Sequence, residues 1–216
     1  NPQRLIARGV DLAQCGCRCM EVTLDSPDAL AVLRTLASRL PESVLLGAAT
    51  VIRREQACDA IAAGAKFVTS PIAAVDLVHV CHQAGVVAIP AGLTPTEIYT
   101  NIEAGARAVK VFPASVLSAE GLKSILQLGP FQNTFIMSAG GVLPCDVTTW
   151  LEAGADAVAL GTQLVGADIK LASSPQGGVQ GVVGLQFHES ELEWEEQGRE
   201  RACRLFASLR PGADSL

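Results

Sequence analysis

A short phrase repeats along the chain: a small residue and a glycine, followed by a run of β-branched and other apolar residues. It occurs at 14–24, 62–72, 83–92, 103–113 and 152–162. Glycine readily takes the left-handed conformation that ends a helix, so each phrase predicts a helix end followed almost at once by a buried strand. Two further apolar strands are expected at 44–50 and 134–140. Continuous apolar strands that alternate with helices are typical of parallel sheets covered on both faces.

Seven strands are expected in this way, roughly 20–25 residues apart, with a helix-sized segment between neighbours. A doubly wound open sheet has the same rhythm, but its fingerprint G-x-G-x-x-G after the first strand is absent. We therefore expect an α/β chain that folds as a (β/α)8 TIM barrel. The eighth strand is expected either upstream of Asn1, so that the first strand is missing from this chain, or at 182–189.

Length and composition favour one packed domain over residues 1–216, with a C-terminal extension from about residue 168. The tail from about residue 190 predicts an amphipathic helix for packing or subunit contact. The net charge of −6, without a basic run, argues against a nucleic-acid partner. The apolar runs are strand-sized and therefore too short to cross a membrane.

The seven cysteines are expected to be reduced thiols, because a disulfide scaffold would be shorter and richer in loops. The run Cys15-Gly-Cys17-Arg-Cys19 lacks a second ligand pair at zinc spacing, so buried small side chains are favoured over a metal site. No metal or cofactor is expected. Reduced thiols indicate an intracellular protein, in the cytoplasm or, if a transit segment precedes Asn1, in the plastid stroma.

Barrel enzymes place their sites at the carboxyl ends of the strands, and there Lys110 stands out. It lies in the apolar strand AVKVFP, where a charged amine is costly to bury and a neutral amine can attack a carbonyl. A strand-end lysine that reaches water is the alternative interpretation. Thr50, Pro90 and Phe112 also lie at strand ends and are candidates for substrate binding.

Glu21 is a carboxylate within the apolar segment CMEVTL. Side chains alternate along a strand, so Glu21 is expected to share a face with Cys17, Cys19, Thr23 and Asp25. If that face is the barrel interior, Glu21 points toward Lys110 and can move protons next to an iminium. A solvent-exposed carboxylate at a strand edge is the alternative.

Glycines follow the last two expected strands, at Gly140-Gly141 and at Gly161-Thr162. Glycine lets backbone N–H groups approach an anion closely, and a phosphate site after strands 7 and 8 recurs in barrels. A simple turn is the other interpretation of Gly-Gly here.

Several segments resemble one family in order from about residue 4 to 168. They are EVTL at 21–24, GAAT-V at 47–51, FVTSP at 67–71, VKVFPA at 109–114, AGGV at 139–142 and LGT at 160–162. The chain is similar to the 2-keto-3-deoxy-6-phosphogluconate aldolase and 4-hydroxy-2-oxoglutarate aldolase family, which are class I, Schiff-base enzymes. The K-x-F-P-A strand together with an upstream E-V-T-L strand carries most of the resemblance.

The resemblance implies a homotrimeric barrel that acts on a small-molecule keto acid without a metal. It implies that Lys110 forms the Schiff base, that Glu21 is the general acid and base, and that Thr50 contacts the pyruvyl part. It also implies a phosphate site, which consists of Gly140, Gly141, Gly161 and Thr162.

Two positions depart from the family pattern. Asp25 stands where the family has an arginine for the substrate carboxylate, and Ala139 replaces a threonine. We therefore expect a class I aldolase, or aldehyde-lyase, that cleaves a 2-keto-3-deoxy (phospho)sugar acid to pyruvate and an aldehyde. The alternatives are a catalytically weakened, aldolase-like scaffold subunit and another phosphosugar enzyme on the same barrel.

Overall fold

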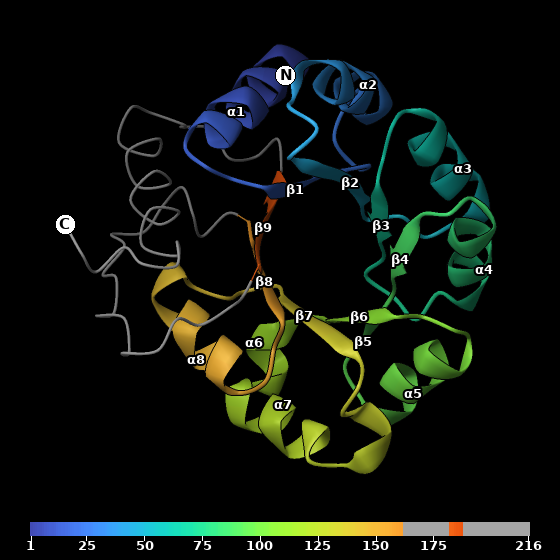
Figure 1. The fold of residues 1–216 in the computed structure, drawn as a ribbon, viewed down its shortest axis with the longest axis vertical. Helices are drawn as coiled ribbons and strands as arrows, with labels where there is room; N and C mark the ends of the chain where they lie inside the picture. Colours follow the sequence, from blue (N-terminus) through green and yellow to red (C-terminus); the bar gives the residue numbers. More distant parts are fainter. Residues whose placement is uncertain (162–181, 188–216) are drawn as a thin grey trace.

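The computed structural model of the chain describes residues 1–161 and 182–187. Its parallel strands form a ring, and the helices surround that ring on the outside (Figure 1). The strands are β1 (Cys19–Thr23), β2 (Leu45–Ala49), β3 (Phe67–Thr69), β4 (Val87–Ile89), β5 (Ala91–Gly92), β6 (Ala108–Val111), β7 (Phe135–Ala139), β8 (Ala157–Leu160) and β9 (Val182–Phe187). The expected (β/α) barrel is thereby confirmed.

The sheet runs in the order β4-β3-β2-β1-β9-β8-β7-β6-β5. The segments at its two ends, β4 and β5, are consecutive in the chain and are separated only by Pro90, and β4 also contacts β6. The ring is therefore closed. Proline has no N–H to donate, which interrupts the strand, but the Pro90 carbonyl still accepts a hydrogen bond from the Lys110 amide at 2.8 Å.

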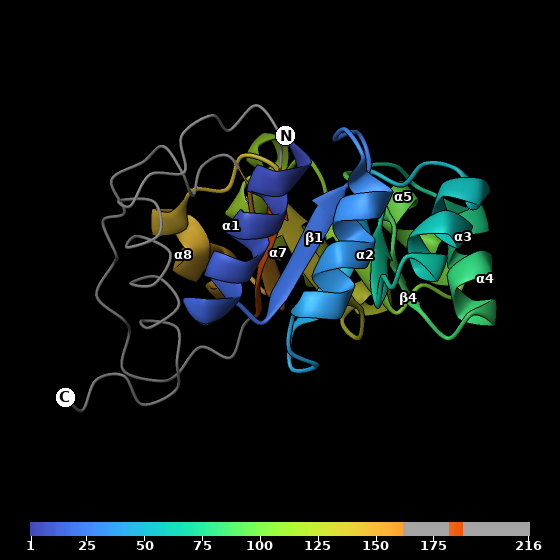
Figure 2. The same cartoon turned by 90° about the horizontal axis from the view of Figure 1, so that it is seen from above.

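Helices follow the strands and cover the outside of the ring, as the view from above also shows (Figure 2). They are α1 (Pro2–Gln14), α2 (Ala29–Arg39), α3 (Arg54–Ala62), α4 (Val75–Gln83), α5 (Pro95–Glu103), α6 (Ala114–Leu117), α7 (Ala119–Leu126) and α8 (Val147–Glu152), with short 3-10 turns at Gly129–Phe131 and Pro144–Asp146.

The start of α5 shows how local sequence sets these boundaries. Thr94 accepts a hydrogen bond from the Glu97 amide, Glu97 accepts one from the Thr94 amide, and Pro95 holds the first helical position. Within the described part of the chain, no helix is both long and apolar enough to cross a membrane.

The apolar side chains form two clusters. The larger cluster fills the layer between strands and helices. The smaller one lies inside the ring and consists of Phe67, Ile89, Ala108, Met137, Ala139, Ala157 and Ala159, with Cys19 and Phe112 against it. The interior is therefore a packed apolar volume in which a polar side chain is conspicuous.

The structure decides between the two positions expected for the eighth strand. β9 pairs in parallel with both β1 and β8, so residues 182–187 fill this place in the ring. The remaining extension, and the amphipathic helix expected from about residue 190, lie outside the described residues.

Two expectations about cysteines were wrong. Cys15 is disulfide-bonded, whereas Cys17, Cys19, Cys58 and Cys81 are free thiols, as is Cys145. Cys17 precedes β1 and packs in the outer cluster, so the side-chain alternation that places Glu21 inside does not extend back to it.

Candidate active site

Lys110 lies in β6, and its side chain is only 1% exposed. Its strand neighbour on the same face, Ala108, belongs to the interior cluster, so the lysine points into the ring. The Nζ atom is 3.7 Å from Glu21 Oε1 and 5.1 Å from the centre of the Phe112 ring. The aromatic face covers one side of the amine, and the carboxylate lies within ion-pair distance of it.

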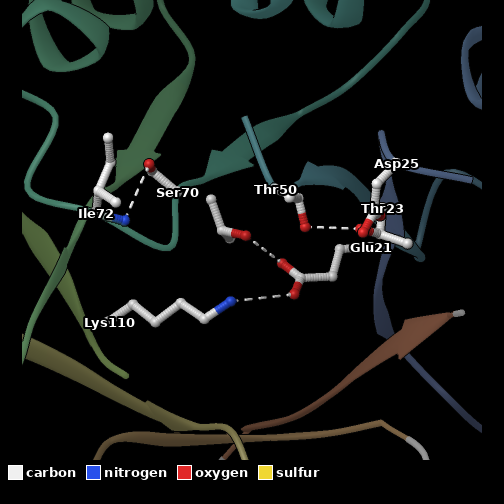
Figure 3. Close-up of polar contacts among 8 residues, drawn as sticks. Glu21, Thr23, Asp25, Thr50, Ser70, Ile72 and Lys110 are labelled. Carbon is white, nitrogen blue, oxygen red and sulfur yellow. Dashed lines mark hydrogen bonds and ion pairs between the residues drawn. The ribbon is translucent and has the colours of Figure 1, made fainter. Parts of the chain in front are cut away.

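Glu21 comes from the opposite side of the ring, on β1, and is 2% exposed. Figure 3 shows its carboxylate between the lysine and the strands that follow β1. Its Oε2 atom accepts a hydrogen bond from Thr69 Oγ1 at 2.8 Å. Its Oε1 atom, which faces Lys110, has no hydrogen-bond partner among the described residues. Oε2 is thus held by a hydrogen bond, and Oε1 is available to exchange a proton.

An ion pair in this apolar interior constrains the chemistry. Removing one partner of a buried pair leaves the other charge without compensation, which costs several kcal/mol. Water is largely excluded from the amine, because the Lys110 side chain is almost completely buried. A nucleophilic amine beside a carboxylate that can carry its proton is what imine formation requires.

A second polar group consists of Thr23, Asp25 and Thr50 (Figure 3). Thr23 Oγ1 donates to Asp25 Oδ1 and lies 2.6 Å from Thr50 Oγ1. A carboxylate only accepts, so the single hydroxyl hydrogen of Thr23 is used on Asp25. The hydrogen between the two threonines therefore belongs to Thr50, whose hydroxyl oxygen offers lone pairs and no hydrogen to a ligand.

The loop after β7 carries Gly140 and Gly141 with φ values of 87° and 80°, a region that L side chains rarely adopt. A Cβ at Gly140 would lie 2.8 Å from the Phe112 ring, and one at Gly141 would lie 2.7 Å from Ser115. The Gly140 carbonyl accepts the Ser115 amide at 3.0 Å, whereas the Gly140 and Gly141 amides bond to no other described residue. These two amides are available to an anion.

The remaining candidates divide as follows. Gly161 directly follows β8 and is half-buried, and Thr162 lies outside the described residues. The Pro90 carbonyl accepts the hydrogen bond from the Lys110 amide, and its role in substrate binding stays a prediction. In residues 1–161 and 182–187, no group of three or more His, Cys, Asp or Glu side chains is arranged to hold a metal ion.

Sequence reasoning missed Thr69. It is a polar residue at the end of the apolar strand β3, two positions after Phe67 and therefore on the interior face. That alternation was the available signal. The hydrogen bond to Glu21 depends on which residues of β1 and β3 face each other across β2, and the sequence pattern alone does not give that register.

A buried lysine beside a glutamate inside a (β/α) barrel fits the class of lysine-dependent aldolases. Comparison with known proteins gives the family. The family model for KDPG and KHG aldolase matches residues 4–175, and the chain belongs to this family. The family expected from the sequence motifs is confirmed, and with it the class, an aldehyde-lyase.

Individual relatives agree with this assignment. The chain is 28% identical over 164 residues to a 2-dehydro-3-deoxy-6-phosphogalactonate aldolase from Escherichia coli strain K12, covering 76% of this chain and 79% of the relative. It is 40% identical over 130 residues to a 2-dehydro-3-deoxy-phosphogluconate aldolase from Treponema pallidum, covering 59% of this chain and 60% of the relative.

A solved structure shares the fold. It is the KDPG aldolase from Legionella pneumophila, with pyruvate captured as a covalent carbinolamine intermediate. The TM-score is 0.65 at 24% identity, covering 94% of this chain and 86% of that chain.

Proposed function

We propose that this class I aldolase cleaves a 2-keto-3-deoxy sugar acid to pyruvate and an aldehyde through a Schiff base on Lys110. The observation that carries the proposal is the 3.7 Å separation, in an apolar interior, between Lys110 Nζ and Glu21 Oε1, an oxygen that accepts no hydrogen bond from the described residues. The carbinolamine that pyruvate forms on the Legionella aldolase supports it, because that species precedes an imine.

The chemistry follows from these two side chains. Glu21 Oε1 takes a proton from Lys110, and the resulting neutral amine attacks the C2 carbonyl of the substrate. Glu21 then gives this proton to the C2 oxygen, which leaves as water, so that an iminium ion and an ionised Glu21 remain. Glu21 Oε1 removes the proton of the C4 hydroxyl, the C3–C4 bond breaks, and its electrons form the C2=C3 bond of an enamine while the aldehyde leaves. Glu21 then returns the proton to C3, and water hydrolyses the iminium to pyruvate and free lysine.

The far end of the substrate is proposed to bind after β7 and β8. The amides of Gly140 and Gly141 support a phosphate there, because two adjacent N–H groups without internal partners attract an anion. Gly161 and Thr162 complete this proposed site. A phosphorylated substrate is therefore favoured over its unphosphorylated form.

We also propose that the chain forms the homotrimer that the family resemblance implies. The expected result is a solution mass three times the chain mass of 22.5 kDa, measured by light scattering after size exclusion. A mass equal to that of one chain at micromolar concentration contradicts the trimer and leaves the chemistry at Lys110 untouched.

Trapping the imine tests the proposed chemistry. Pyruvate with borohydride is expected to add one reduced pyruvyl group to the wild-type chain, and peptide mass spectrometry is expected to place it on Lys110. Lys110→Arg is expected to abolish the adduct, because a guanidinium stays protonated and is not nucleophilic. Glu21→Gln keeps some imine formation but loses most turnover, since only the proton carrier is removed. A wild-type chain without adduct sinks the Schiff-base proposal.

A second candidate function, a weakened aldolase-like scaffold subunit, is favoured by one observation. The Thr50 hydroxyl hydrogen is directed at Thr23, and Asp25 replaces the arginine of the family, so the place for a substrate carboxylate has lost donors. Failure of the wild-type chain to form the adduct, together with success of Asp25→Arg, is the outcome expected for this candidate.

A further inference from the structure

The two oxygens of the Glu21 carboxylate have different surroundings. Oε2 is bound by Thr69 Oγ1 at 2.8 Å, and both side chains are buried. Oε1 has no hydrogen-bond donor among the described residues and lies nearest the lysine amine. A hydrogen bond to one oxygen fixes the rotation of the carboxylate and so decides which oxygen faces Lys110.

The backbone holds Thr69 firmly. The carbonyl of Thr69 accepts the Val51 amide at 3.1 Å, and the next amide, from Ser70, donates to the Ile89 carbonyl at 3.1 Å. Threonine is β-branched and has few allowed χ1 rotamers. The direction of its hydroxyl is therefore set by the barrel and not by the flexible glutamate.

A glycine makes the contact across β2 feasible. Glu21 is opposite Gly47 on β2, and Gly47 is opposite Phe67 on β3. A Cβ at Gly47 would lie 2.4 Å from the Phe67 ring, so the ring occupies the space of the missing side chain. The Phe67 ring fills the space beside Gly47. Because Gly47 has no side chain, none stands on β2 between the Glu21 carboxylate and Thr69 on β3.

We propose that Thr69 is a positioning residue for proton transfer. Its hydroxyl holds Oε2 of Glu21, so that Oε1 faces the substrate atoms next to the imine on Lys110. The inference rests on the proposed function, because it assigns Glu21 the proton. Thr69 itself touches neither the amine nor the reacting atoms. Its contribution is to the orientation of the carboxylate, through the hydrogen bond to Oε2.

Among the described residues, the ionisable groups that face Glu21 inside the ring are Lys110 from β6 and Cys19 from β1, with Asp25 beyond Thr23 on the same strand face. Burial and then the neighbouring Glu21 raise the pKa of the Cys19 thiol to about 12, so this thiol stays neutral in the working range. Lys110 is within ion-pair distance of Oε1, and loss of the Thr69 hydroxyl is therefore expected to act through the orientation of the carboxylate toward the lysine.

Exchange of the pyruvate methyl protons for deuterium, followed by NMR, measures this step without the aldehyde. The variants are Thr69→Val, which keeps the shape and removes the hydroxyl, Thr69→Ala, which removes it with less volume, and Thr69→Ser, which keeps it. The borohydride adduct on Lys110 is measured for each chain in parallel and reports the folded fraction with a competent amine.

The expected result is a loss of about ten- to a hundredfold in exchange rate per adduct-forming chain for the valine and alanine variants, because a hydrogen bond to a charged group is removed. Thr69→Ser is expected to restore the rate to within about threefold of wild type, and Thr69→Val is expected to cost nothing further in a Glu21→Gln background.

The outcomes separate this inference from the function beneath it. A wild-type chain without adduct overturns the proposed function, and the role of Thr69 falls with it. A wild-type chain with adduct, combined with a normal exchange rate in Thr69→Val, overturns the role of Thr69 alone. An equal cost of Thr69→Val with and without the Glu21 carboxylate also overturns it, because the effect then does not pass through Glu21.

Discussion

Asp25 places a carboxylate where the sequence resemblance implies an arginine. Asp25 accepts the hydroxyl hydrogen of Thr23, and the Thr23 oxygen in turn accepts the hydroxyl hydrogen of Thr50. Neither hydroxyl therefore has a hydrogen left to donate to a substrate carboxylate. An anionic substrate group near Thr50 then meets oxygen lone pairs and a like charge, which weakens its binding.

Asp25→Arg is expected to lower the pyruvate concentration that half-saturates borohydride adduct formation by about tenfold, since a guanidinium can bind a carboxylate through two hydrogen bonds. Asp25→Asn is the matched control, because it removes the charge without supplying the fork. We expect it to give a smaller improvement. A half-saturating concentration that is the same in all three chains means that position 25 does not contact the keto acid.

The sequence predicted Lys110 and Glu21 as candidate catalytic residues, but it did not reveal Thr69, which binds Glu21. Lys110 and Glu21 were recognisable because charges are costly in apolar strands and therefore stand out. Thr69 did not stand out, because a threonine at a strand end is common and neutral. Only the register of β1, β2 and β3 reveals that its hydroxyl meets the carboxylate.

In the loop between β7 and α8, the backbone conformation of Gly140 is linked directly to the active site. Gly140 has a positive φ, and the Phe112 ring, which covers Lys110, lies where its Cβ would be. Gly105 has almost the same φ, 90°, but a Cβ there meets nothing within 4 Å. Comparing an alanine substitution at Gly140 with one at Gly105 therefore separates the cost of backbone strain from the cost of the side-chain clash.

Both Gly140→Ala and Gly105→Ala are expected to lose about 1–2 kcal/mol of unfolding free energy through the left-handed backbone. Gly140→Ala is expected to lose about 1–3 kcal/mol more, because the new methyl group must displace the aromatic ring. Urea unfolding measures both. The Lys110 adduct should form more slowly only in Gly140→Ala, and equal losses in the two variants would show that the ring moves aside freely.

The elements themselves were largely predictable, because the glycine that ends each helix and the apolar run after it are local signals. Two details were not. The strand expected at 83–92 is split at Pro90, since a residue without an N–H cannot continue the ladder. The position of β9 between β1 and β8 depends on which edges remain open once the other strands have paired, and no local pattern records that.

Buried thiols link the pH to the stability of the whole molecule. Burial raises the pKa of Cys17 from an ordinary value of 9.0 to about 12 and that of Cys81 to about 11. At a pH between the ordinary thiol pKa and the raised pKa of the buried thiol, the folded chain keeps the thiol proton and the unfolded chain loses it. Stability from each thiol is thus complete below pH 9 and is lost as the pH rises toward the folded value.

Unfolding free energy is therefore expected to fall above pH 9, by about 1.4 kcal/mol per pH unit for each such thiol. Cys17→Ala is expected to flatten this slope by about that amount, measured by urea unfolding at several pH values between 8 and 11. A slope that is the same in Cys17→Ala and wild type contradicts the assignment to the buried thiol.

Closure of the ring by β9 has a consequence for the order of events during synthesis. Cys19 on β1 pairs with Gly184 on β9, so the first of the described strands along the chain receives this neighbour only when the last of them has been made. Until then the edges of β1 and β8 expose unpaired N–H and C=O groups, which are templates for pairing with other chains. Contacts so distant in sequence also slow folding, because the long loop must close before they form. The nascent barrel is therefore most exposed to aggregation, and most in need of chaperones, in the interval before residue 187 emerges.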